Sequence, residues 1–585
     1  MTPRTATPPP RPSLLARFGP LTAIVLAIAL VAVLASTGRG DDNVSSAAPA
    51  SDTKVGSSNK QLPISWAEAK KAGTTNELDW GTNCDRALGK IKLPSNAAPP
   101  CLAARPEVTG GATYQGVTAD TIKIVTYEPA DDDLSASLQS TLDPPDVQRD
   151  TRTKLLQMYE KLYSTWGRKL EIIPFKGTGS SQTASRADAV KVATEIKAFA
   201  SVGGPGQESA YAEELASRGV LCIGCGLSVP DSTFQKNAPF MWGNLQTPEQ
   251  YLLNVGDYVV GRLLGRNATF AGDPKLRSKK RVFGVVHFEQ DPPVFGGTEE
   301  LVAKRGAAQG YKSVVNLTYQ LVIPELGEKA RTLVARLKDA GVTTVIFLGD
   351  PIMPIYLTQA ATDQNYFPEW FITGTVLTDT TVFGRQYDQK QWAHAFGVSS
   401  LPTRVPPNQG EAWKMYKWYY GTDPASKKLV AVLNEPLRIL MLGIHMAGPH
   451  LTPETFRDGL FAFPPTVSKP TSPRMSFGNH GIFEKPDYLA VDDMVEIWYD
   501  AKASGVDEQG KKGKGMMRYA NGGKRYLPGQ MPTTDSDAFK KKGSVMLLPK
   551  APAADLPPQY PPPPGSPAAE AAGSSSSTST TKPSG

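Results

Sequence analysis

Strand-like and helix-like segments alternate along the middle of the chain. Residues 121–127 alternate between apolar and polar positions, the period of a β-strand, whereas the apolar residues of 152–166 recur with helical spacing. The same order returns later, with strands expected at 281–286, 313–317 and 342–348 and helices at 298–309 and 328–340. Repeated strand–helix–strand units of this length predict parallel sheets with helices on both faces.

Two such blocks, near 114–245 and 250–372, predict the fold class. It is α/β, with two doubly wound parallel-sheet lobes joined by a hinge, a hydrophobic helix at the N-terminus and disordered tails. In open parallel sheets, ligands bind outside the carboxyl ends of the strands. We therefore expect an interlobe cleft lined by residues of 203–230 and 288–297.

Composition divides the chain further. We expect seven segments: 1–20 as a cytoplasmic n-region, 21–36 as an apolar helix, 37–113 as a tether and a Cys84/Cys101 extension, 114–250 as lobe 1, 251–372 as lobe 2, 373–500 as the remainder of the lobes with their crossovers, and 501–585 as a basic, then Pro/Ser-rich tail, mostly disordered.

The uncharged apolar run at 21–36 sets the compartment. Arg4, Arg11 and Arg17 precede it, so the N-terminus stays inside and the body is exported. The run is either a signal peptide cleaved after Ala35 or a retained signal-anchor that holds the protein at the membrane. The protein is then secreted, or anchored at the cell surface. No cysteine follows the run, so the chain lacks a lipoprotein anchor.

Charge argues against a nucleic-acid partner. The 585 residues carry 63 Lys and Arg against 56 Asp and Glu, a net of +7. The excess lies in the ends of the chain, where 1–40 hold four arginines and no acid. A nucleic-acid-binding body would instead concentrate its basic residues on the folded part.

The four cysteines form two local pairs. An even count in an exported chain indicates disulfides, so we expect Cys84 to bond Cys101. Cys222 and Cys225 end an apolar run, where a structural disulfide, buried thiols and a redox pair all remain open. No second ligand pair stands at metal-site spacing.

No catalytic motif is present. The chain has no nucleophile elbow, phosphate loop or metalloprotease helix, and its five histidines are scattered. We expect a protein that is not an enzyme, with no catalytic residue, metal or cofactor.

A specific resemblance rests on several segments in a fixed order. They are Gly116–Ile124 (GVTADTIKI), Val202–Pro205 (VGGP), Arg281–Val286 (RVFGVV), Leu337–Val345 (LKDAGVTTV) and Glu496–Asp500 (EIWYD). Over about 114–500 the chain resembles type 1 periplasmic binding proteins of the leucine/isoleucine/valine-binding type. That family supplies solute receptors for ABC importers, which implies a small-molecule ligand and importer membrane subunits as partners. The alternative is a membrane-anchored sensor or surface scaffold with the same fold and no transport role.

The resemblance also implies where the ligand binds. In lobe 1 it assigns Gln207, Ser209, Gly226 and Ser228, whose hydroxyls and backbone N–H groups would bind an anion or carbonyl. Helix and turn capping is the competing role of the two serines. In lobe 2 it assigns Phe295, Asp350, Thr375 and Asp379.

Two of these positions depart from the family pattern. Phe295 lacks the hydroxyl of the usual tyrosine, and Thr375 replaces the acid that pairs with an amino acid's ammonium. The ligand class therefore stays open between amino-acid-like solutes, amides and short organic acids. We expect a solute without a free α-ammonium, unless Asp379, Asp350 or Asp291 restores the missing charge.

Overall fold

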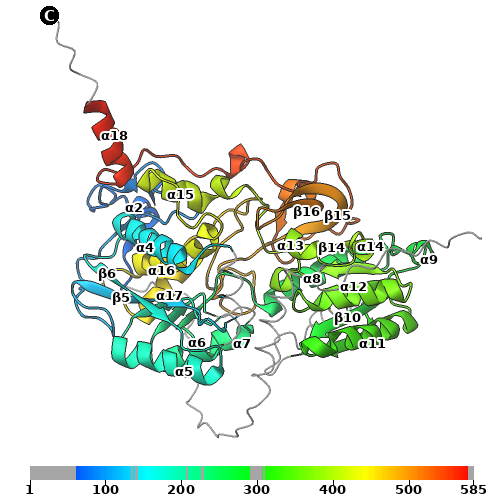
Figure 1. Ribbon diagram of the computed structural model, residues 1–585. Helices are drawn as coiled ribbons and strands as arrows, with labels where there is room; N and C mark the ends of the chain where they lie inside the picture. The colour runs from blue at the N-terminus through cyan, green and yellow to red at the C-terminus, as the bar shows by residue number, and fades with distance from the viewer. Residues whose placement is uncertain are drawn as a thin grey trace, which may run out of the picture.

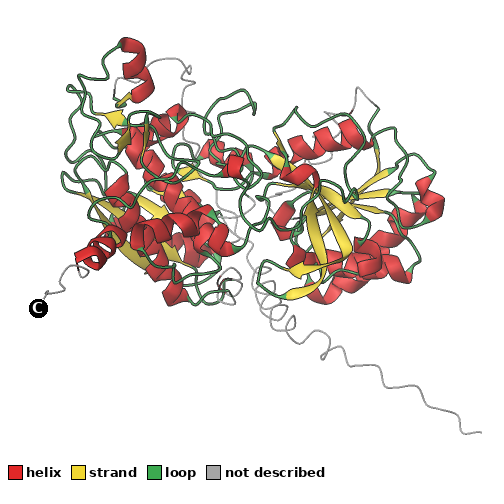
Figure 2. Cartoon of the chain, turned by 90° about the horizontal axis from the view of Figure 1, so that it is seen from above, coloured by secondary structure: helices red, strands yellow, loops and turns green. Residues whose placement is uncertain are grey.

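The computed structural model describes residues 61–133, 136, 139, 142–205, 209–225, 229–289, 306 and 310–577. The apolar run at 21–36 lies outside these residues, as does the predicted helix at 298–309 apart from Gly306. Two α/β lobes stand side by side, each with a sheet flanked by helices (Figures 1 and 2). The predicted α/β fold with two lobes is confirmed, whereas the tail expected to be disordered after residue 500 contains strands and a helix.

The first lobe is built on a five-stranded sheet in which all neighbours are parallel. In spatial order its strands are β6 (Lys169–Lys176), β5 (Thr121–Glu128), β7 (Ala200–Val202), β8 (Leu221–Ile223) and β9 (Met241–Trp242). Its helices are α4 (Pro145–Leu162), α5 (Gln182–Lys191), α6 (Ala210–Ser217), α7 (Asp231–Lys236), α15 (Glu411–Tyr420), α16 (Val430–Ala447) and α17 (Pro453–Ala462). Helix α4 begins seven residues before the predicted start at Arg152 because Pro145 fits its first turn.

Helix α16 fills the core of the first lobe. By length and composition it is the one helix of the described chain that could cross a membrane, yet 72% of it is buried inside the protein. Leu437, Leu440 and Ile444 are fully buried in the same core as the strands of the first sheet. Burial against the lobe accounts for its apolar sequence.

The second lobe is built on a mixed sheet. In spatial order its strands are β11 (Ser313–Tyr319), β10 (Phe283–Phe288), β12 (Thr344–Leu348), β13 (Glu369–Ile372), β14 (Ala395–Ser399), β15 (Met494–Val506) and β16 (Lys512–Tyr519), with β17 (Arg525–Tyr526) also on β15. The first five strands run parallel to one another. Strand β15 pairs antiparallel with β14, and β16 and β17 each pair antiparallel with β15. Its helices are α8 (Pro248–Tyr258), α9 (Pro274–Arg277), α11 (Leu326–Asp339), α12 (Met353–Asp363), α13 (Thr381–Gly384) and α14 (Gln389–Trp392).

The boundary expected at residue 500, between the lobes and the tail, does not coincide with the end of a structural element. Strand β15 crosses that position, and β16 pairs with it along Lys512–Tyr519. Lys512 and Lys514 point outward while Met516 and Met517 are buried, so the basic segment is the edge of a sheet. The lysines and glycines there obscured the alternation of a strand.

The N-terminal extension is a small folded unit. It contains β1 (Ile64–Ser65), α2 (Trp66–Ala72), β2 (Cys84–Asp85), β3 (Lys90–Ile91) and β4 (Leu102–Ala103). The predicted Cys84–Cys101 disulfide is confirmed, with Cα atoms 5.5 Å apart, and Cys222 bonds Cys225. Both pairs are buried, which agrees with a structural role.

Three crossovers join the lobes, at 243–247, 400–410 and 463–493. The first and third are paired through the backbone, because Gly243 donates to the Tyr488 carbonyl at 3.0 Å and Ala490 donates to the Gly243 carbonyl at 3.1 Å. The second and third are tied by Arg525, which donates to the carbonyls of Ser400 and Leu401 and pairs with Asp493 at 2.8 Å.

The C-terminal segment is a fourth connection. Val545 pairs with Tyr519 in the second lobe, and Leu548 donates to the Arg404 carbonyl of a crossover. Further along, Trp418 of α15 donates to the Tyr560 carbonyl at 2.8 Å. Helix α18 (Pro567–Ser577) then lies against α15 in the first lobe (Figure 1). We call residues 545–577 the strap.

Loss of Arg525 should destabilise the protein strongly. Both side chains of the Arg525–Asp493 pair are fully buried, so Arg525→Met leaves the Asp493 carboxylate without its cation and the Ser400 and Leu401 carbonyls without this donor, although Ser468 and Arg474 N still donate to Asp493. We expect a loss of about 3–5 kcal/mol in the free energy of unfolding, measured by urea denaturation. The control is Lys417→Met, because Lys417 is 58% exposed and its partner Asp423 45% exposed, so about 0–1 kcal/mol is expected. Equal losses in the two variants would contradict this account.

Candidate functional site

The strand order of each sheet marks where a ligand can bind. In the first lobe the chain leaves β5 for β6 on one side and then returns to β7 on the other, so the loops after β5 and β7 diverge. In the second lobe β10 lies between β11 and β12 in the same way. Such switch points open a crevice at the carboxyl edge of a parallel sheet.

In the first lobe, the loops after β7 and β8 lie against each other. Gly203 has a φ of +79°, and a Cβ on Gly204 would stand 3.3 Å from the Cβ of Cys225. The Cys222–Cys225 disulfide therefore holds the loop after β8 beside the loop after β7. Gln207, Gly226 and Ser228 follow directly in the sequence and lie outside the described residues.

Ser209 is engaged within its own helix. It precedes α6, and its hydroxyl donates to Glu213 at 2.6 Å rather than accepting from a helix N–H group. Its hydroxyl stays part of the candidate site only if a solute displaces Glu213.

In the second lobe, Asp350 lies just past the end of β12 and is 8% exposed. Its Oδ1 accepts from the backbone N–H groups of Ile352 and Met353, at 2.7 and 3.0 Å, and the Tyr319 hydroxyl donates to its Oδ2. Burial raises the pKa of this carboxyl. The side chain thus organises the start of α12 from inside the lobe.

Thr375 and Asp379 follow β13 and are 0% and 4% exposed. The Thr375 hydroxyl accepts from Gly349 N at 3.2 Å, which links the loops after β12 and β13. The Ser399 hydroxyl, at the end of β14, donates to Asp379 Oδ2, while Asp379 Oδ1 has no hydrogen-bond partner within the described part of the chain. Burial raises the pKa of Asp379 to about 7.

The structure therefore brings Asp350, Thr375 and Asp379 together at the carboxyl edge of the second sheet. All three are buried beneath the surface of the lobe. Phe295, the fourth residue assigned there, lies outside the described residues, with most of 288–297.

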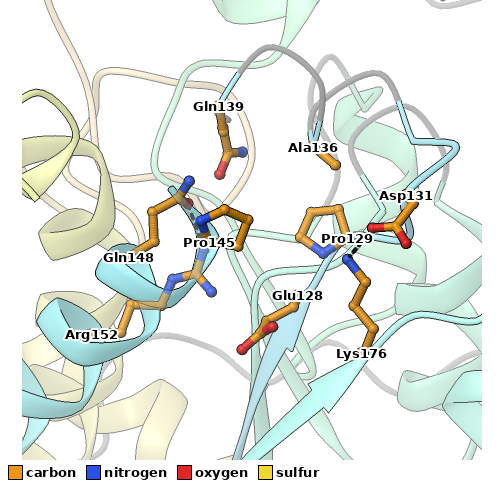
Figure 3. Close-up of a pocket in the computed structure, with 9 residues that line it drawn as sticks. All are labelled: Glu128, Pro129, Asp131, Ala136, Gln139, Pro145, Gln148, Arg152 and Lys176. Carbon is orange, nitrogen blue, oxygen red and sulfur yellow. Dashed lines mark hydrogen bonds and ion pairs between the residues drawn. The ribbon is translucent and has the colours of Figure 1, made fainter. Parts of the chain in front are cut away.

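A cavity of about 130 Å³ opens at the carboxyl edge of the first sheet (Figure 3). Its walls come from the paired strand ends Glu128 and Lys176 and from the first turns of α4, where Gln148 and Arg152 point toward it (Figure 3). The walls carry both signs of charge, so the cavity suits a polar solute.

Arg152 is the least satisfied charge of this cavity. Arg149 pairs with both oxygens of Glu128 and its hydrogen bond lowers the pKa of that carboxyl, and Lys176 pairs with Asp131 at 2.9 Å. With the described residues Arg152 forms only two long hydrogen bonds, each of 3.4 Å, to the Tyr127 carbonyl and to Gln148. Burial lowers the pKa of its guanidinium, which remains a cation.

Sequence reasoning missed this cavity. The apolar spacing predicts a helix that begins at Arg152, whereas Arg152 lies two turns inside α4. The Pro144–Pro145 pair that starts the helix was the available signal, because proline favours the first helical turn.

Comparison with known proteins gives fold likenesses alone. No family model matches the chain, and no curated protein matches it. Among similar solved structures is the solute-binding protein of an ABC transporter from Rhodopseudomonas palustris BisB5, in complex with 3,4-dihydroxybenzoic acid. It is 13% identical, with a TM-score of 0.46 over 72% of this chain and 99% of the other.

Two more are bacterial proteins of the same kind. The branched-chain amino acid transporter substrate-binding protein LivJ from Streptococcus pneumoniae, in complex with isoleucine, is 14% identical over 68% of this chain and 100% of its own, with a TM-score of 0.43. A type 1 periplasmic binding protein from Bordetella pertussis Tohama I is 13% identical over 68% and 100%, with a TM-score of 0.44. These neighbours are type 1 periplasmic binding proteins, the family that the sequence resembles.

Asp379 should make stability depend on pH. A carboxyl whose pKa is raised to about 7 in the folded protein, from an ordinary 3.8, contributes stability that is fully present below pH 4 and is lost as the pH rises through 7. Asp379→Asn removes that loss, which amounts to at most about 4 kcal/mol for a shift of this size. We expect the difference in melting temperature between pH 5 and pH 8 to shrink in the variant.

The surface residue Asp363 provides the control for this measurement. It is exposed on α12 of the same lobe, so Asp363→Asn should leave the pH dependence as in the parent. An unchanged pH dependence in Asp379→Asn would show that the buried carboxyl does not titrate in this range.

Proposed function

We propose that the protein is an extracytoplasmic solute-binding protein that captures a small organic solute between its two lobes for an ABC-type importer. The observation that supports this most is the connection of two doubly wound sheets by three crossovers. Each lobe then moves as a rigid unit, and the backbone bends only at the crossovers between the lobes. Residues from both carboxyl edges can close on one solute, and the closed form is the state that a membrane partner would recognise.

The residues proposed to hold the solute come from five loops. Gln207, Ser209, Gly226 and Ser228 would supply hydroxyl, amide and backbone N–H donors from the first lobe. Phe295 would cover the solute from the second lobe. Asp350, Thr375 and Asp379, which are buried, would fix the loops that carry the contact surface.

The proposed solute lacks a free α-ammonium. Thr375 has no charge, and the two oxygens of Asp350 are engaged by Tyr319 and the start of α12. Burial favours the neutral form of Asp379. An ammonium next to these groups would lose its hydration without gaining a carboxylate, which costs several kcal/mol. An amide or an apolar carboxylic acid fits better.

A calorimetric comparison tests the ligand class. We expect 4-methylpentanoate, the des-amino analogue of leucine, to bind at least about tenfold more tightly than leucine, because one unpaired charge costs 1.4 kcal/mol or more. Tight leucine binding that Asp379→Asn abolishes would contradict this ligand class and leave the two-lobed binding function intact.

Closure and uptake test the function itself. A thermal-shift panel of amino acids, amides and aliphatic and aromatic acids should identify a stabilising solute. That solute should reduce the radius of gyration in small-angle X-ray scattering, since it closes the lobes. Deletion of the gene should abolish uptake of the same solute. Unimpaired uptake would contradict a transport role.

A further inference from the structure

A second cavity, of about 220 Å³, lies beside the first lobe. Three segments meet there: the Cys84–Cys101 extension, the crossover loop at 465–469 and the strap at 556–560. In Figure 1 the blue N-terminal extension and the orange-to-red strap run together above the first lobe. The cavity contains no residue of the loops assigned to the interlobe solute.

Two lysines line this cavity, and neither forms an ion pair with any described residue. Lys469 donates to Asn96 Oδ1 at 2.7 Å, a neutral acceptor that leaves donors free. Lys90 keeps an exposed surface, yet burial among the cavity walls and then the charge of Lys469 lower its pKa. Two ammonium groups are thus held near each other without a counter-ion from the protein.

The carboxylates behind the cavity are already engaged. Glu411 accepts from the Ser95 hydroxyl at 2.6 Å and from the backbone and side chain of Asn96, each at 3.0 Å. Asp555 accepts from the backbone and hydroxyl of Thr471, at 3.0 and 2.9 Å. These hydrogen bonds hold Asn96 and the strap in place. Lys90 and Lys469 remain the charged residues of the cavity wall that form no ion pair with a described residue.

The other wall of the cavity is apolar. Val467 is 71% exposed, the largest exposure among the large apolar side chains of the described chain, and Leu556 is 42% exposed. Ala98 and Pro558 extend this surface. Exposed apolar side chains beside an unpaired charge indicate a surface that is completed by a ligand.

We propose that this cavity binds a small organic carboxylate, with the carboxylate between Lys90 and Lys469 and the apolar body against Val467 and Leu556. Its volume equals that of about seven liquid water molecules, which limits the ligand to a short aliphatic or single-ring acid. The site does not depend on the interlobe solute. A bound acid would join the N-terminal extension to the strap, because both contribute to the walls.

Titration of the full chain with hexanoate, followed by saturation-transfer NMR, tests this site. We expect millimolar binding, the range for a ligand of eight non-hydrogen atoms. Lys90→Gln and Lys469→Gln should each weaken it about tenfold, since each removes a charge-assisted hydrogen bond. Val467→Asp should abolish the part of the binding that depends on these lysines, and hexanamide should show no binding that depends on them. Lys90 and Val467 lie at the surface, so these variants are expected to keep the melting temperature of the parent.

Lys414→Gln is the matched control, because Lys414 is an exposed lysine of α15 in the same lobe that does not line the cavity. It should bind hexanoate like the parent. Binding in the interlobe cleft is insensitive to Lys90→Gln, so the radius of gyration with hexanoate should be the same in the parent and in Lys90→Gln. Equal affinities in the parent and both lysine variants, a hexanamide affinity that falls in those variants as the hexanoate affinity does, or no binding at 20 mM, roughly the weak limit of such a ligand, would each overturn the proposal.

Discussion

The buried ion pair between Arg525 and Asp493 fixes the place where the two lobes meet. Arg525 reaches the second crossover through the carbonyls of Ser400 and Leu401 and the third through Asp493. A buried guanidinium needs every one of these acceptors, so the two crossovers keep a single relative arrangement. With the backbone pairing of Gly243 to Tyr488 and Ala490, all three crossovers become one hinge.

This hinge has consequences for how each lobe is built. The core of the first lobe combines strands from before the first crossover with α15, α16 and α17 from after the second. The sheet of the second lobe likewise joins β10–β14 to β15 and β16, which follow the third crossover. Neither core is complete until distant parts of the chain have met. The lobes are therefore linked in stability, although each keeps its own sheet.

The strap adds a restraint beyond the three crossovers. Its contacts begin on Tyr519 in the second lobe and end on α15 in the first, with Asp555 holding the third crossover on the way. Opening of the lobes would have to stretch or release this segment. The extension stapled by Cys84–Cys101 packs on the same side, through Tyr560 and Asp85 at 3.1 Å. The strap and the N-terminal extension are thus joined to each other, so both would affect opening of the lobes.

Local sequence determined the elements and their order. The periods of residues 121–127 and 328–340 reappear as β5 and α11, because a strand or helix with one buried face must repeat its apolar residues at that period. The same rule gave the two lobes and the parallel sheets. Local spacing also gave the disulfide, since Cys84 and Cys101 close a short loop.

Tertiary structure decided what lies inside and what is paired. The resemblance assigned Thr375 and Asp379 to the site, but only the fold shows that both are buried and that Ser399 engages Asp379. The basic, Pro-rich segment after residue 500 carries no strong local pattern, and its order comes from partners such as Tyr519, Thr471 and Trp418. Burial and pairing of this kind depend on residues hundreds of positions apart. The period of a single segment cannot contain that information.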